Sequence, residues 1–244
     1  AEVPAGCAIR RILSYGISKR MKNLRDLEIN DLKKLLEEMG EKPFRAKQIY
    51  TWLHQNLVEH YDEMTNISKG LRDRLSAEYS VALPETVEVL TSKIDGTKKF
   101  IFRMQDGHVI ESVWMEYQHG HSVCISSQVG CRMGCKFCAS TLDGLARNLT
   151  SGEMLGQIYQ IQRTTGARVD NIVIMGSGEP LDNYDEFTRF IRMISDENGL
   201  HISRRNITIS TCGLVPKIRQ LADENYGITL ALSLHAPNDE TRKT

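Results

Sequence analysis

Three of the chain's six cysteines lie in the stretch Cys131-Arg132-Met133-Gly134-Cys135-Lys136-Phe137-Cys138. The spacing C-x3-C-x2-C on one short loop allows each thiolate to bind a separate iron of a cubane iron–sulfur cluster. Because such clusters usually take four cysteines, one iron would stay open to another ligand. Structural zinc is the alternative, with His119 or His121 as the fourth ligand. A secreted disulfide scaffold is excluded, since such chains are shorter and richer in cysteine.

Strand and helix patterns alternate from residue 122 onward. Apolar runs predict strands over 122–126, 171–175, 206–210 and 228–234. Helix starts are indicated by a capping box at Thr150 and Glu153, by Asn183 with Glu186, and by Pro216. Gly199 is expected to end the helix that begins at Asn183. This alternation predicts an α/β fold with a parallel sheet and right-handed crossovers.

Polar and glycine-rich segments follow each predicted strand. The cysteine loop follows the first strand and Gly176-Ser177-Gly178-Glu179-Pro180 the second, while Ser210-Thr211 and Ser233-Leu234-His235 end the third and fourth. Catalytic groups of parallel barrels gather at the carboxyl ends of strands, so we expect these segments on one rim. The glycines would let the backbone approach a ligand, and Glu179 can receive an ammonium or a ribose hydroxyl. Taken singly, each of these segments has an ordinary explanation. The glycine-rich segment is also typical of a simple turn, and His235 could be a hydrogen-bonded histidine of the core.

The chain before residue 117 carries different patterns. Residues 1–20 precede Met21-Lys22-Asn23, which reads like a natural start, so we treat them as an extension of doubtful status. Apolar periodicity predicts a helical accessory domain over 21–80. Asp95-Gly96 and Asp106-Gly107 between β-rich runs predict an antiparallel β-hairpin connector over 81–116. Residues 117–244 then form the core.

Composition narrows the class of protein. The 244 residues hold 31 Lys and Arg against 31 Asp and Glu, which excludes a generally basic nucleic-acid binder. No apolar run approaches the roughly 18 residues of a membrane span, and the first twenty residues lack a signal peptide's apolar stretch, so we expect a cytoplasmic protein. Local basic clusters remain, either to contact nucleic-acid phosphates or as ordinary solvated faces. They are Arg204, Arg205, Lys217 and Arg219, with no acidic residue between 201 and 219, and Arg45 with Lys47 beside aromatic residues.

The motifs together resemble those of a known family. The three-cysteine loop followed by a Gly-Glu-Pro turn is similar to the radical S-adenosylmethionine (SAM) superfamily. The stretches 123–130, 175–183, 210–213 and 233–238 narrow the resemblance to the RlmN/Cfr adenine methyltransferases. It covers residues 21–244. It implies a partial (β/α) radical SAM barrel, incomplete at its C-terminal end, preceded by a small helical domain and a β-meander.

The resemblance also implies cofactors and residue roles. The cofactors are a [4Fe-4S] cluster, whose metal ligands are Cys131, Cys135 and Cys138, and SAM. The positions that match SAM contacts are Gly178, Glu179, Ser210, Ser233, Leu234 and His235. Two catalytic residues are implied: Cys124 as the thiol that closes a transient disulfide, and Glu111 as a proton acceptor.

From the residues alone these last roles are open. Glu111 shares a strand face with Val109, Val113 and Met115, which suits a carboxylate with a task or a partner, or a face that is simply exposed. Cys124 alone reads as a small buried apolar residue. Cys7 and Cys212 are interpreted as structural or incidental.

The implied activity is methylation of adenine carbon 2, in 23S rRNA of the peptidyl-transferase centre and at the tRNA adenosine 3′ of the anticodon. A methylated cysteine of the enzyme carries the methyl group, and a reductant protein such as flavodoxin or ferredoxin supplies electrons. Full-length family members are expected to be monomers without membrane association. Methylation at carbon 8, as in Cfr-like resistance enzymes, and a non-catalytic zinc-dependent RNA-binding module are the alternatives. Because family members continue past the fourth strand to the methyl-carrying cysteine, we expect this shorter chain alone to be inactive.

Overall fold

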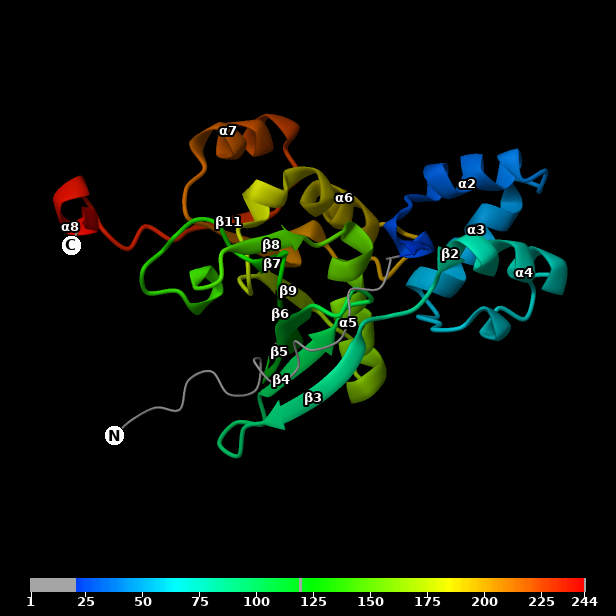
Figure 1. Ribbon diagram of the computed structural model, residues 1–244, viewed down its shortest axis with the longest axis horizontal. Coiled ribbons are helices and arrows are strands. Elements are labelled where there is room, and N and C mark those ends of the chain that lie inside the picture. The colour runs from blue at the N-terminus through cyan, green and yellow to red at the C-terminus, as the bar shows by residue number, and fades with distance from the viewer. Residues whose placement is uncertain (1–20, 119, 244) are drawn as a thin grey trace.

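A seven-stranded mixed sheet organises the chain in the computed structural model, which describes residues 21–118 and 120–243 (Figure 1). The strand order is β11-β10-β9-β6-β5-β4-β3. The strands are β3 (Glu85–Thr91), β4 (Lys98–Arg103), β5 (Val109–Tyr117), β6 (Gly120–Ile125), β9 (Asn171–Ile174), β10 (Ile207–Thr211) and β11 (Thr229–Leu232). The extension 1–20, with Cys7, and His119 lie outside the described residues.

The sheet joins an antiparallel part to a parallel part. Strands β3 to β6 pair antiparallel, whereas β6, β9, β10 and β11 pair parallel. The predicted α/β class is confirmed. The hairpins expected over 81–116 form, but as part of this sheet rather than as a separate connector, since β5 bonds to β6 with Val113 opposite Cys124. Alternating residues show that a segment is a strand without showing which sheet it joins.

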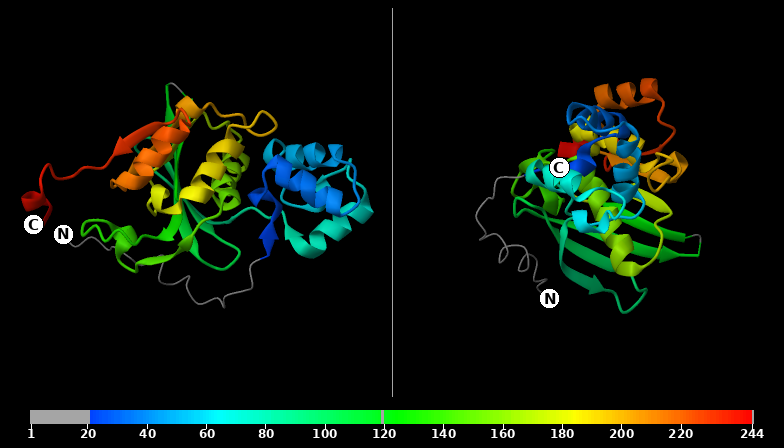
Figure 2. Two further views of the ribbon diagram at one scale, coloured as in Figure 1. Left: turned by 90° about the horizontal axis from the view of Figure 1, so that it is seen from above. Right: turned by 90° about the vertical axis from the view of Figure 1, so that its right-hand side faces the viewer.

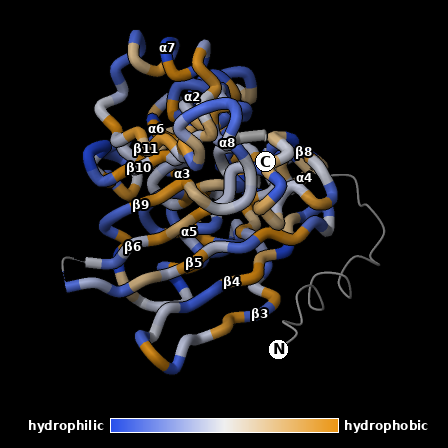
Figure 3. Tube along the Cα trace, turned by 90° about the vertical axis from the view of Figure 1, so that its left-hand side faces the viewer, coloured by the Kyte–Doolittle hydropathy of each residue, from blue (hydrophilic) through white to orange (hydrophobic). Residues whose placement is uncertain are grey.

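Three helices follow the parallel strands and lie along the sheet (Figure 2). They are α5 (Ser151–Thr165), α6 (Tyr184–Ile194) and α7 (Val215–Glu224), and the short α8 (Asp239–Lys243) comes last. The capping box predicted for α5 is confirmed, because Thr150 Oγ1 accepts from the Glu153 N–H at 3.2 Å and a Glu153 carboxylate oxygen accepts from the Thr150 N–H at 3.0 Å. Figure 3 shows the apolar stretches that run through the central strands and form the core.

The start and end of α6 differ from the prediction. The Asn183 side chain does not cap the helix; it donates to the carbonyls of Ser127 and Leu149 at 2.9 and 2.7 Å. Glu186 accepts from the Ser151 N–H instead. The helix ends at Ile194, five residues before Gly199, since the Ser195 N–H closes the last turn. Asparagine favours both caps and turn contacts, and here tertiary partners decide.

The helical unit comprises α2 (Ile29–Glu38), α3 (Phe44–His54) and α4 (Lys69–Glu78), at the right of Figure 1. Its ends are tied by a parallel pair of short strands, β1 (Lys22–Asn23) and β2 (Tyr79–Ser80). Its core is apolar and consists of Leu32, Leu36, Ile49, Leu53, Leu71 and Leu75. Within the part of the chain that the structure describes, no helix has the length and apolar character needed to cross a membrane.

The unit docks against α5 through buried polar contacts. The Gly152 N–H at the start of α5 donates to Asp26 Oδ1 at 3.0 Å, next to Arg25, whose guanidinium is fully buried and donates to the carbonyls of Val58 and Val81. His54 Nδ1 lies 2.8 Å from the Tyr159 hydroxyl of α5. A Cβ on Gly152 would lie 2.5 Å from an Asp26 oxygen, so the start of α5 accepts the unit only because that residue is glycine.

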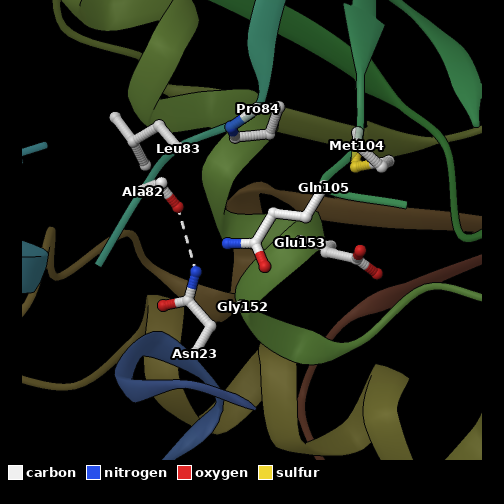
Figure 4. Close-up of a pocket in the computed structure, with 8 residues that line it drawn as sticks. All are labelled: Asn23, Ala82, Leu83, Pro84, Met104, Gln105, Gly152 and Glu153. Carbon is white, nitrogen blue, oxygen red and sulfur yellow. Dashed lines mark hydrogen bonds between the residues drawn. The ribbon is translucent and has the colours of Figure 1, made fainter. Parts of the chain in front are cut away.

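A small cavity lies at this junction (Figure 4). It is lined by Asn23, Ala82, Leu83, Pro84, Met104, Gln105, Gly152 and Glu153, and Asn23 donates across it to the Ala82 carbonyl at 2.9 Å. None of the residues singled out in the sequence for cofactor chemistry lines it.

Candidate active site

The cysteine loop, residues 131–144, is the tip of a short hairpin that the sequence analysis did not predict. Its strands are β7 (Gln128–Gly130) and β8 (Leu145–Asn148), which pair antiparallel. The Cys131 N–H donates to the Gly144 carbonyl at 3.0 Å and closes the base of the loop. At Gly130 the backbone has φ +73°, and a Cβ there would lie 2.0 Å from the Gly144 oxygen. Only glycine allows this closure.

Within the loop the backbone curls around the second and third cysteines. The Cys138 N–H donates to the Cys135 carbonyl at 3.0 Å, and Thr141 Oγ1 donates to both the Cys135 and Cys138 carbonyls. The loop's apolar side chains are nevertheless turned outward, with Phe137 69% and Leu142 80% exposed.

The three thiols suit a cluster better than a single ion. Burial raises the pKa of the Cys131 thiol, and the charges of Cys138, Cys135 and Glu179 raise it further, so thiolates gathered here need a compensating cation. Each of the three thiolates could hold its own iron of a cubane cluster, whereas a zinc ion would need a fourth ligand from outside the three cysteines. The donor set therefore fits an iron–sulfur cluster.

His121 is misplaced for the zinc alternative. It lies near the amino end of β6, where its ring stacks on Trp114 and its Nδ1 is 3.0 Å from the Arg168 carbonyl. The cysteine loop follows the opposite end of that strand. Four further strand residues at about 3.3 Å each separate the two ends, so His121 is not a ligand partner of the loop. The other candidate, His119, lies outside the described residues.

The glycine-rich loop 176–180 follows β9 and packs on the end of β6. A Cβ on Gly176 would lie 2.6 Å from Ser126 Oγ, and one on Gly178, at φ +103°, would lie 2.6 Å from the Gln128 Cβ. Close approach by protein thus accounts for these glycines, whereas the sequence interpretation assigned them to a ligand.

Glu179 is turned into the protein and only 4% exposed. Its carboxylate accepts from the Leu181 N–H at 3.1 Å and from the Cys212 N–H at 2.8 Å. Burial, together with the charge of Glu179 and a hydrogen bond to it, raises the pKa of the Cys212 thiol to about 12. Glu179 therefore links the glycine-rich loop to the end of β10. No pattern in the sequence indicates that Cys212 contacts Glu179.

Three contacts gather the predicted strand-end groups on one rim. Ser210 and Ser233, at the ends of β10 and β11, lie with their hydroxyls 2.8 Å apart. Ser140 Oγ of the cysteine loop is 3.1 Å from Ser177 Oγ of the glycine-rich loop. Phe137 meets His235 with ring centroids 4.5 Å apart.

His235 and Leu234 are exposed on this rim, and His235 adopts φ +55°. The alternative of a core histidine is wrong for His235. A non-glycine residue held in this left-handed region is uncommon, and such backbone strain clusters at functional sites.

Cys124 and Glu111 lie on the sheet face that the helices leave open. Cys124 pairs with Val113, and Glu111 is two residues from Val113 on the same face of β5. Burial raises the pKa of the Cys124 thiol, and this outweighs a hydrogen bond from the Met175 backbone, which lowers it. Glu111 lies 3.4 Å from Lys99 Nζ, and their side chains are 39% and 44% exposed. Glu111 is therefore a half-exposed carboxylate with Lys99 as its ion-pair partner.

The basic residues between 201 and 219 do not form one patch. Arg204 and Arg205 lie in a turn before β10, whereas Lys217 and Arg219 lie in α7 after it. Five strand residues at about 3.3 Å each separate the two pairs. Lys217 also lies over the Tyr184 ring at 4.5 Å. Closeness in sequence was therefore a poor guide to this surface.

Two family models match the chain. The model described as ribosomal RNA large subunit methyltransferase N-terminal domain matches residues 22–81, and that of the radical SAM superfamily matches residues 125–244. A radical SAM methyltransferase from Sphaerobacter thermophilus has a similar structure, with a TM-score of 0.85 and 42% identity over 91% of this chain and 66% of that chain.

Curated relatives agree with both models. A probable dual-specificity RNA methyltransferase RlmN of Lachnoclostridium phytofermentans is 62% identical over 220 residues, which are 90% of this chain and 62% of the relative. One of Lachnospira eligens is 56% identical over 224 residues, or 92% of this chain and 64% of the relative. The chain thus spans 62% and 64% of the length of these two relatives. From the motifs, the rim and these matches, we conclude that the chain belongs to the RlmN family of the radical SAM superfamily.

Proposed function

We propose that this protein methylates carbon 2 of an adenosine in 23S rRNA and of the tRNA adenosine 3′ of the anticodon, by way of a methylated cysteine. The observation that carries the proposal is the rim, where the cysteine loop, the glycine-rich loop and the ends of β10 and β11 meet beside the face that bears Cys124 and Glu111. The names of the relatives, dual-specificity RNA methyltransferases, support RNA as the substrate class.

Cys131, Cys135 and Cys138 would hold a [4Fe-4S] cluster, and the SAM contacts would come from the loops around it. These contacts are Gly178, Glu179, Ser210, Ser233, Leu234 and His235. When bound, cluster and SAM together supply radical chemistry that side chains alone lack. The chain's own contribution is placement, because the contacts between the two loops and β11 bring the ligating and binding groups to one place.

Cys124 and Glu111 would act on the open face next to this rim. The raised pKa keeps the Cys124 thiol protonated in the resting state. In the proposed role its sulfur would bond to that of the methyl-carrying cysteine while the S–C bond to the methyl carbon breaks; the thiol loses its proton and the methyl carbon takes one up. Glu111 would accept a proton from the substrate ring, since its carboxylate is half exposed on the same face. A cytoplasmic reductant protein of the flavodoxin or ferredoxin kind would deliver electrons to the cluster.

Substitution of Cys124 tests this assignment in a chain as long as the curated relatives. Cys124→Ala should still cleave SAM and should trap an enzyme–RNA adduct, seen as a band of increased mass on a denaturing gel, because the resolving thiol is gone. Thr208→Ala changes a residue of β10 on the same face of the sheet as Cys124, and this variant should methylate normally. Normal methylation by Cys124→Ala would refute the role.

The product distinguishes the alternatives. Digestion of the RNA product to nucleosides should release 2-methyladenosine, whereas release of 8-methyladenosine would establish the Cfr-like activity. A colourless protein with tight zinc and no methylation would instead establish the RNA-binding module.

A further inference from the structure

Gln128 occupies the space between the cysteine loop and the glycine-rich loop, and its side chain is fully buried. Its Oε1 accepts from the Glu179 N–H at 2.9 Å. Its Nε2 donates to Asn148 Oδ1 at 2.8 Å and to Asp182 Oδ2 at 2.9 Å. Both donors of the amide and its acceptor are therefore used, which only asparagine or glutamine can achieve, and only glutamine at this length.

The backbone of the same segment holds the glycine-rich loop as well. The N–H groups of Ser127 and Gln128 both donate to the Ser177 carbonyl, at 2.9 and 3.1 Å. Gly178 passes so close to Gln128 that a Cβ would lie 2.6 Å from that of Gln128. The position of the glycine-rich loop is thus set by Gln128 through contacts at Ser177, Gly178, Glu179 and Asp182.

A further ion pair extends these contacts into the cysteine loop. Arg132, which follows the first cysteine, donates to both oxygens of Asp182 at 2.8 and 2.6 Å. Asp182 accepts from Gln128 at the same time. Hydrogen bonds therefore run from Glu179 through Gln128 and Asp182 to Arg132, from one loop to the other.

We propose that Gln128 is a positioning residue that fixes the glycine-rich loop relative to the cysteine loop, so that both face one SAM molecule. The inference rests on the proposed function, since it assigns SAM to this rim. It also explains the residue type. Methionine of similar shape would leave the buried Glu179 N–H unpaired, and glutamate would face the Asp182 carboxylate without a proton to donate.

Gln157 provides a matched control. It is also fully buried, and its amide also has several partners: it accepts from Ser112 Oγ and the Ser126 N–H and donates to the Ser126 carbonyl. It lies in α5 and has no hydrogen bond to residues 176–182. Replacing either glutamine by methionine removes a buried amide, but only Gln128 bonds directly to Glu179 and Asp182.

The experiment compares Gln128→Met with Gln157→Met after anaerobic reconstitution of the cluster. Both should bind iron as the unchanged chain does. Gln128→Met should bind SAM about tenfold more weakly, or about 1.4 kcal/mol, whereas Gln157→Met should keep the original affinity. Arg132→Gln, at an exposed position that does not threaten folding, should weaken SAM binding in the same direction by a smaller factor. Unchanged affinity of Gln128→Met, or an equal loss in Gln157→Met, would overturn the proposal.

Hydrogen exchange supplies a readout that needs no cofactor. In the cofactor-free chain, Gln128→Met should speed exchange of the Glu179 amide at least tenfold, and Gln157→Met should not. Protection of that amide in Gln128→Met would also overturn the proposal. If a chain as long as the curated relatives, with Gln128 unchanged, bound its cluster but no SAM while the exchange result held, the proposed function would fail and the loop-holding role of Gln128 would stand.

Discussion

The two faces of the seven-stranded sheet differ in chemistry. On the face covered by α5 and α6, Ile172, Ile174, Ile207 and Ile209 are 0–1% exposed and belong to the apolar core. On the opposite face the neighbouring residues of the same strands, among them Cys124, Val173, Thr208 and Ser210, are half-buried. Because successive residues of a strand point to opposite faces, each strand serves both.

The difference separates stability from chemistry. The covered face supplies hydrophobic burial, and the open face with its rim supplies thiols, hydroxyls and a carboxylate that a core would not tolerate unpaired. Substitution of a buried isoleucine on the covered face should therefore lower stability and leave cofactor binding unchanged, whereas substitution of a cysteine of the rim should abolish cofactor binding and leave the fold unchanged.

The largest effect is expected on the rim. Cys131→Ala, Cys135→Ala and Cys138→Ala should each abolish cluster assembly, because each thiolate holds a separate iron. Circular dichroism should show an unchanged fold, since the loop is held by backbone bonds that remain. Iron and sulfide analysis after reconstitution measures the effect. Cys212→Ala should retain iron, and a cluster that survives loss of one loop cysteine would break the comparison at this point.

Adjacent residues of β9 test the two faces directly. Ile172→Ala should lower the free energy of unfolding by about 2–5 kcal/mol, because it opens a cavity in the core. Val173→Ala, pointing to the open face, should lower it by about 1 kcal/mol or less. Urea unfolding of the two variants makes the measurement. Equal losses would show that the open face carries as much of the stability as the covered one.

Sequence patterns predicted the parts of the molecule that depend on local signals. The capping box at Thr150 and the four parallel strands are local, and so is the clustering of cysteines at 131–138. The hairpin of β7 and β8 was missed because its strands are too short to show alternation. The burial of Arg25 was missed because its partners, the carbonyls of Val58 and Val81, are more than thirty residues away in sequence.

The same limit applies to the candidate site. Motif position placed the cysteine loop, Ser210, Ser233 and His235 on one rim, because the carboxyl ends of parallel strands must meet. It did not show that Gln128 holds Glu179 and Asp182, or that Arg204 and Lys217 lie apart. Those relations depend on how loops fold back over strands, and no spacing in the sequence encodes them.

The smallest effect is expected in the pH dependence of stability and comes from His54, where the helical unit contacts α5. Burial, with the charge of Arg25, holds the pKa of His54 well below its ordinary value of 6.5. The unfolded chain takes up a proton below about pH 6.5 and the folded His54 does not, so stability is full above that pH and falls by up to about 1.4 kcal/mol per pH unit below it. Urea unfolding at pH 7.5 and 5.5 should show the loss, and His54→Gln should reduce it. His60→Gln, exposed in the same unit, should not; an equal slope in His54→Gln would contradict the assignment.

Anaerobic reconstitution followed by electron paramagnetic resonance tests the central claim most directly, that the rim on the open face holds a cluster with one iron available to SAM. The account predicts about four irons per chain and, after reduction, a cluster signal that shifts when SAM is added. Stoichiometric zinc with no iron uptake, or a cluster signal indifferent to SAM, would contradict it.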